Sequence, residues 1–64
     1  MQTPAYDILR KDGLALVWVE TAYDIESARS RIERLADQSR NEYVVFDQHT
    51  RQIVASLVNP TSDG

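Results

Sequence analysis

Apolar residues occupy both odd and even positions along two neighbouring segments near the start of the chain, residues 6–11 and 14–21. Asp12-Gly13 lies between them, and an Asp-Gly pair between β-prone runs is a strong hairpin signal because a type I′ turn needs a positive φ at both central positions. With this two-residue loop, Leu9 faces Leu16. The pattern predicts an antiparallel hairpin that is apolar on both faces, because side chains alternate along each strand.

A second hairpin is predicted near the end of the chain. Residues 42–47 and 52 to 57 or 58 form the strands, and the polar residues 48–51 form the turn. We expect Asp47 to pair with Gln52, so that both faces are again apolar. The two faces then carry Tyr43, Val45, Val54 and Ser56 on one side and Val44, Phe46, Ile53 and Ala55 on the other.

Between the hairpins, residues 24–39 follow the spacing of an amphipathic helix. Asp24 is a favourable N-cap, and Glu26 in the first turn complements the helix dipole. One stripe of the helix is apolar and is expected to be buried. Its members are Ile25, Ala28, Ile32, Leu35 and Ala36.

These elements predict an α+β fold with the order β-β-α-β-β. The four strands form one antiparallel sheet in the order 2-1-3-4, and the single helix packs on one face. Residues 5–58 make one domain, because 64 residues are too few for two. The ends, residues 1–4 and 59–64, are expected to be flexible.

One helix of about 15 residues is ~22 Å long and covers only one face of such a sheet. The β-branched Ile8, Val17 and Val19 suit the face under the helix, so the opposite face still carries apolar side chains. The chain is short and has no cysteine, which leaves oligomerisation as the way to add stability. We therefore expect a homodimer, or else a second protein, to cover this face. The predicted interface residues are Leu9, Leu14, Leu16, Trp18, Val45 and Val54.

Charge and composition narrow the function. The net charge of −3 and the pI of about 4.8 disfavour nucleic acid as a partner. The first residues show no basic segment followed by an apolar run, so we expect no signal peptide, and the apolar run 14–19 is far shorter than the ~20 residues of a membrane span. One histidine and no cysteine give no metal site. We expect a cytoplasmic, non-enzymatic interaction or regulatory module without a cofactor.

Two other functions remain open as alternatives. Asp47 and His49 are two residues apart and invite a hydrolase hypothesis, since a carboxylate orients an imidazole, but no motif places a nucleophile beside them. Trp18, Phe46 and the three tyrosines suggest an aromatic sheet face that binds a ligand or single-stranded nucleic acid by stacking. The net negative charge of the chain argues against nucleic acid as the ligand of this face.

The blocks YDILRKDG, LVWVETAYDIESARSRIERLA and EYVVFDQHTRQIV together resemble a family of short bacterial proteins. The resemblance implies a single small α+β domain and assigns no activity and no site residues. The strands followed by an amphipathic helix are also similar to small antitoxin domains that pair with RNA-cleaving toxins. This chain does not carry their DNA-binding extension, which argues against that role.

Overall fold

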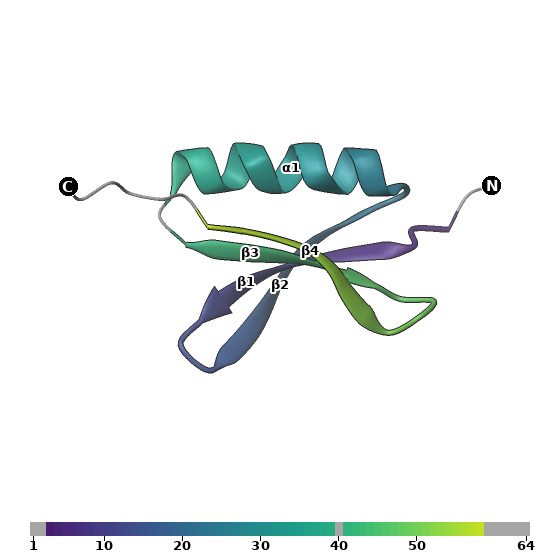
Figure 1. Cartoon of the computed structure of the whole chain (residues 1–64), viewed down its shortest axis with the longest axis horizontal. Helices are drawn as coiled ribbons and strands as arrows, with labels where there is room; N and C mark the ends of the chain where they lie inside the picture. The colour runs from purple at the N-terminus through teal and green to yellow at the C-terminus, as the bar shows by residue number, and fades with distance from the viewer. Residues whose placement is uncertain (1–2, 40, 59–64) are drawn as a thin grey trace.

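The structure of the chain is a computed structural model, and it describes residues 3–39 and 41–58. The four strands form one antiparallel sheet in the order β2-β1-β3-β4, with the single helix on one side (Figure 1). The predicted fold class and strand order are therefore confirmed. Of the predicted flexible ends, 1–4 and 59–64, residues 1–2 and 59–64 lie outside the described residues. The elements are β1 (Tyr6–Asp12), β2 (Ala15–Ala22), α1 (Ile25–Gln38), β3 (Glu42–Asp47) and β4 (Gln52–Val58).

Both ends of α1 are fixed by specific hydrogen bonds. The backbone N–H of Ser27 donates to Asp24 Oδ1 at 2.7 Å, which makes Asp24 the N-cap that the sequence predicts. At the other end, the N–H of Ser39 donates to the carbonyl of Leu35 at 3.1 Å. The hydroxyls of Ser39 and Tyr43 are 2.8 Å apart, so the end of the helix is tied to β3.

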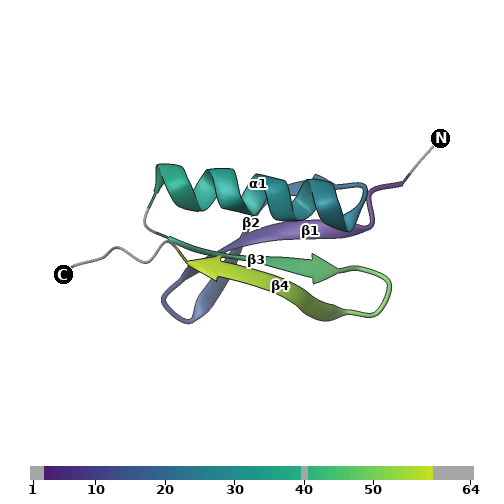
Figure 2. The ribbon, with the colours of Figure 1, turned by 45° about the horizontal axis from the view of Figure 1, so that its top comes forward.

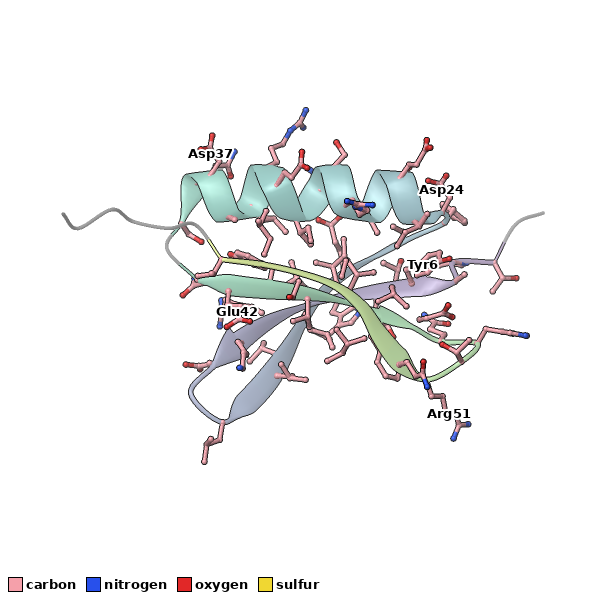
Figure 3. All side chains as sticks on the ribbon, in the orientation of Figure 1. Tyr6, Asp24, Asp37, Glu42 and Arg51 are labelled. Atoms are coloured by element: carbon pink, nitrogen blue, oxygen red, sulfur yellow. The ribbon has the colours of Figure 1, made fainter. Side chains whose placement is uncertain are left out.

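The core is a single apolar layer between α1 and the sheet, and α1 lies along the strands (Figures 2 and 3). Ile8 of β1 and Val45 of β3 are paired neighbours in the sheet and are both fully buried. The helix contributes Ala28, Ile32 and Ala36, and its two alanines let the helix backbone approach the sheet closely. The apolar stripe predicted for the helix is therefore the face that packs.

The turn of the first hairpin lies one residue later than predicted. Asp12 pairs with Ala15, so Gly13 and Leu14 form the two-residue loop. Gly13 has φ 65° and Leu14 has no positive φ, as in a type II′ turn. The predicted type I′ turn would force Asp12 to a positive φ as well, whereas this turn places that demand only on glycine. Leu9 consequently pairs with Trp18 instead of Leu16.

Each edge strand contains a β-bulge. The register shifts at Val19 in β2 and at Val54 in β4, so neither residue has a cross-strand partner. Because the side-chain period of a strand is two, one extra residue moves every later side chain to the other face. Glu20 therefore points toward the helix, where it pairs with Arg31 at 2.7 Å.

Two residues predicted for the interface, Val45 and Val54, lie elsewhere in the structure because of the pairing of β3 and the bulge in β4. Val45 lies across from Ile8 and is buried under the helix instead of on the opposite face. Val54 sits in the bulge and borders a hollow between α1 and the β4 edge, beside Arg29 and Ile32. Neither residue belongs to the face away from α1.

The two valines are expected to differ sharply in their effect on stability. Val45→Ala removes buried methyl groups and should lower the free energy of unfolding by about 1–3 kcal/mol. Val54→Ala changes a side chain that is 45% exposed and should cost less than about 0.5 kcal/mol. Urea unfolding followed by circular dichroism measures both values. Equal losses for the two variants would contradict the positions described here.

The N-cap gives the fold a defined dependence on acid. The backbone N–H of Ser27 donates to the Asp24 carboxylate and lowers its pKa below the ordinary 3.8. A carboxyl whose folded pKa is depressed stabilises the fold fully above its unfolded pKa, and this stabilisation is lost as the pH falls through the folded pKa. Asp24→Asn keeps the acceptor and should match the wild type at pH 7 while weakening the response below pH 3.8.

Asp24→Ala is the matched variant, because it removes the acceptor and should lower the urea midpoint at pH 7 as well. Urea midpoints measured between pH 7 and pH 2 separate the two effects. Identical midpoints for Asp24→Ala and wild type would show that this cap does not stabilise the helix.

Candidate functional site

The face of the sheet away from α1, hereafter the open face, is covered by no other element of the described chain (Figure 1). The strand pairing places three rows of side chains on it, each row crossing all four strands. The central row contains Trp18, Leu9, Val44 and Ser56. The two outer rows contain Leu16, Lys11, Glu42 and Val58 on one side and Thr21, Asp7, Phe46 and Ile53 on the other.

The middle of the open face is a second apolar cluster, separate from the core under the helix. Val44 is buried although it does not belong to the cluster that packs against α1. Its neighbours across the sheet are Leu9 and Ser56, and Trp18 continues the row on the edge strand. Trp18 remains 59% exposed, so the cluster is only partly covered within one chain.

The sheet curves around this cluster. Figure 1 shows that the ends of both hairpins turn away from α1, so the open face lies between them. A hollow of about 340 Å³ opens on this face, with an apolar floor from β2, β3 and β4. The residues that line it are Lys11, Leu14, Leu16, Glu42, Val44, Ile53 and Ser56.

The charges of the open face are few and partnered. Lys11 and Glu42 lie opposite each other in the sheet, with Lys11 Nζ 3.7 Å from Glu42 Oε1. Figure 3 shows the Glu42 side chain on the side of β3 away from the helix. Asp7 accepts a hydrogen bond from Gln48 Nε2 at 2.9 Å. The face therefore combines a nearly neutral rim with an apolar centre.

The structure brings together four of the six residues predicted for the interface. Leu9, Leu16 and Trp18 lie on the open face, because the shifted turn moves the register by an even number of residues. Leu14 lies at the tip of the first hairpin and borders the hollow. Val45 and Val54 lie elsewhere, as described above.

The prediction missed four apolar residues of the open face: Val44, Phe46, Ile53 and Val58. The first three share one predicted side of the second hairpin, whereas the two residues predicted for the interface from this hairpin, Val45 and Val54, belong to its other side. The pairing of Asp47 with Gln52, which is confirmed, was the signal that grouped Phe46 with Ile53. No local pattern indicated which side of this hairpin would meet the helix.

The pair Asp47 and His49 has a structural role in the second turn. Asp47 Oδ1 accepts hydrogen bonds from the backbone N–H groups of His49 at 2.8 Å and Thr50 at 3.3 Å. The turn also holds Arg51 at φ 62°, and the Arg51 side chain points into solvent (Figure 3). The carboxylate thus organises the turn, which is an ordinary function for aspartate at this position.

The side chains that line the other hollows indicate no particular ligand. One of about 480 Å³ lies between α1 and the end of β4 and is lined largely by helix-surface residues such as Glu33, Arg34 and Asp37. It borders Val58, where the described part of β4 ends, and it contains no buried polar side chain. Within residues 3–39 and 41–58, no three histidine or carboxylate side chains cluster as metal ligands would. In the same ranges, no helix is long and apolar enough to cross a bilayer.

A comparison of the chain with known protein families, characterised proteins and solved structures finds no match. The resemblance to short bacterial proteins therefore remains an expectation that rests on the sequence blocks alone.

The turn interactions predict different effects for neighbouring substitutions. Asp47→Ala leaves two backbone N–H groups without their acceptor and should lower the free energy of unfolding by about 1 kcal/mol. Asp47→Asn retains an oxygen at the same position and should cost less. His49→Ala should change stability by less than about 0.5 kcal/mol, because the His49 side chain is exposed. Thermal or urea unfolding of the three variants provides the measurement, and a large loss for His49→Ala alone would refute this role for the turn.

Proposed function

We propose that this protein is a small interaction module that forms a homodimer through the open face of its sheet. The observation that carries the proposal is the exposed apolar surface of that face, where Trp18 in the central row and Leu16, Ile53 and Val58 in the outer rows are each about half exposed. Monomeric proteins rarely leave a continuous apolar patch of this kind in water. A second copy supplies a matching surface, because a two-fold interface packs the same patch against itself.

The size of the chain supports association. Domains of about 60 residues bury only ~60% of their unfolded surface and are marginally stable alone. A standard dimer interface covers about 800 Å² on each partner. That is about one sixth of the 4767 Å² accessible on this chain. Burying about 400 Å² of apolar surface per copy contributes roughly 10 kcal/mol per copy, before association costs of about 4–15 kcal/mol are subtracted.

The edges of the sheet are less suited to association than the face. Both edge strands contain a bulge, at Val19 and at Val54. Bulges twist an edge and interrupt the row of backbone groups to which another strand would pair. Joining two sheets through β2 or β4 is therefore disfavoured, whereas the open face is uninterrupted from Trp18 to Ser56.

The charges of the open face favour a self-contact over nucleic acid. Among the residues that the structure describes, the one cation in the rows of this face is Lys11, which already faces Glu42, and Asp7 adds a negative charge. A phosphate backbone requires a surplus of positive charge, which this face does not have. Hydrolysis by Asp47 and His49 stays a hypothesis, but Asp47 Oδ1 already accepts two backbone hydrogen bonds within the turn.

Substitution of Trp18 tests the proposed interface. Light scattering after size exclusion should give a dimer mass for the wild type and a monomer mass for Trp18→Glu, since two carboxylates would be placed in an apolar contact. Tyr23→Glu is the matched control, because Tyr23 is 55% exposed but lies in the connection between β2 and α1. It should leave the dimer unchanged.

Trp18 is the only tryptophan, so its fluorescence reports on the same surface without any substitution. We expect the emission of the wild type to move to shorter wavelength as the protein concentration rises through the dimer dissociation constant. A wild type that stays monomeric at millimolar concentration, with emission independent of concentration, would overturn the proposal.

A further inference from the structure

Leu14 occupies an unusual position at the tip of the first hairpin. It is the second residue of the Gly13-Leu14 loop and is fully exposed, at 108% of its reference area. After a glycine in such a turn, the usual residues are asparagine, aspartate or serine, which interact well with water. A leucine gains nothing from this position within one chain, because its side chain is not buried against any other part of the described fold.

The hollow on the open face begins directly beside this leucine. Leu14 forms part of its lining, and Leu16, Val44 and Ile53 supply an apolar floor. The ion pair between Lys11 and Glu42 forms the polar rim. At about 340 Å³, the hollow has room for an aliphatic side chain. A projecting apolar group and an apolar cavity therefore lie side by side on the same surface.

We propose that Leu14 of one copy inserts into the open-face hollow of a second copy, and that the second copy inserts its own Leu14 in return. A two-fold rotation about an axis between the leucine and the hollow places each leucine over the cavity of its partner. The inference rests on the proposed homodimer and adds the contact that anchors it.

Two features favour a second copy over a different occupant. The projecting group that fits the hollow is present on every copy of the chain, beside the hollow itself. The rim carries one positive and one negative charge, Lys11 and Glu42, so the rims of two copies do not repel each other. A small apolar ligand bound in the hollow would leave Leu14 exposed to water. A partner protein with a strong net charge would find no opposite net charge on the rim, because Lys11 and Glu42 balance each other.

Leu14→Ser tests the contact without disturbing the monomer. A Gly-Ser loop is compatible with the same turn, so the circular dichroism spectrum of the monomer should be unchanged. The dimer loses two buried leucine side chains, and its dissociation constant should rise about 100-fold or more. Sedimentation equilibrium measures this constant. Leu14→Met keeps an apolar side chain of similar volume and should retain the dimer, and Tyr23→Ser is the control for an exposed residue outside the face.

A second variant tests the hollow itself. Ser56 lines the hollow and is exposed, so Ser56→Leu should fill the cavity and exclude the partner's leucine. We expect this variant to fold and to dimerise at least tenfold more weakly. An unchanged dissociation constant in both Leu14→Ser and Ser56→Leu would overturn the exchange of leucines.

The outcomes separate this inference from the proposed function. If Trp18→Glu is monomeric and Leu14→Ser still dimerises like the wild type, the open face is the interface but Leu14 does not anchor it. If the wild type is itself a monomer, both proposals fail. If Leu14→Ser is monomeric while its melting temperature at low concentration equals that of the wild type, both proposals are supported.

Discussion

The close approach of one short helix to the two central strands is the constraint on which the rest of this structure depends. Ala28 and Ala36 allow α1 to lie near the sheet, and Ile8 and Val45 are fully buried in the core between α1 and the sheet. This layer uses most of the helix's apolar surface. α1 consequently leaves the opposite side of the sheet uncovered. In a single chain, side chains on that side are buried only at its centre, around Val44.

The two bulges link the core to the open face. In β2 the bulge at Val19 turns Glu20 toward the helix, where Arg31 neutralises it, and keeps Trp18 on the other side. In β4 the bulge at Val54 brings Ala55 beside Val45 while Ile53 stays with Phe46. The same irregularities increase the local twist and interrupt both edges, so the surface that remains for association is the face.

The first hairpin illustrates how a local rule is obeyed in an unexpected way. Asp12-Gly13 correctly indicated a turn. In the structure, however, Gly13 with its positive φ is the first residue of the two-residue loop and not the second. The cost is a leucine at the tip in full contact with water. In the proposed dimer, this residue is the one whose environment changes most, since it moves from complete exposure into an apolar cavity.

The sequence by itself determined the two hairpins, the helix with its Asp24 cap and buried stripe, and the surplus of apolar side chains over what one helix can cover. These features depend on spacing within a few residues, which the chain carries locally. Only the tertiary structure decided which side of the second hairpin meets the helix and therefore that Val45 is core while Val44 and Phe46 belong to the open face. Both sides of β3 are apolar, so the choice came from its pairing with β1, where Val45 lies opposite Ile8, and a pairing between residues 37 positions apart leaves no local trace.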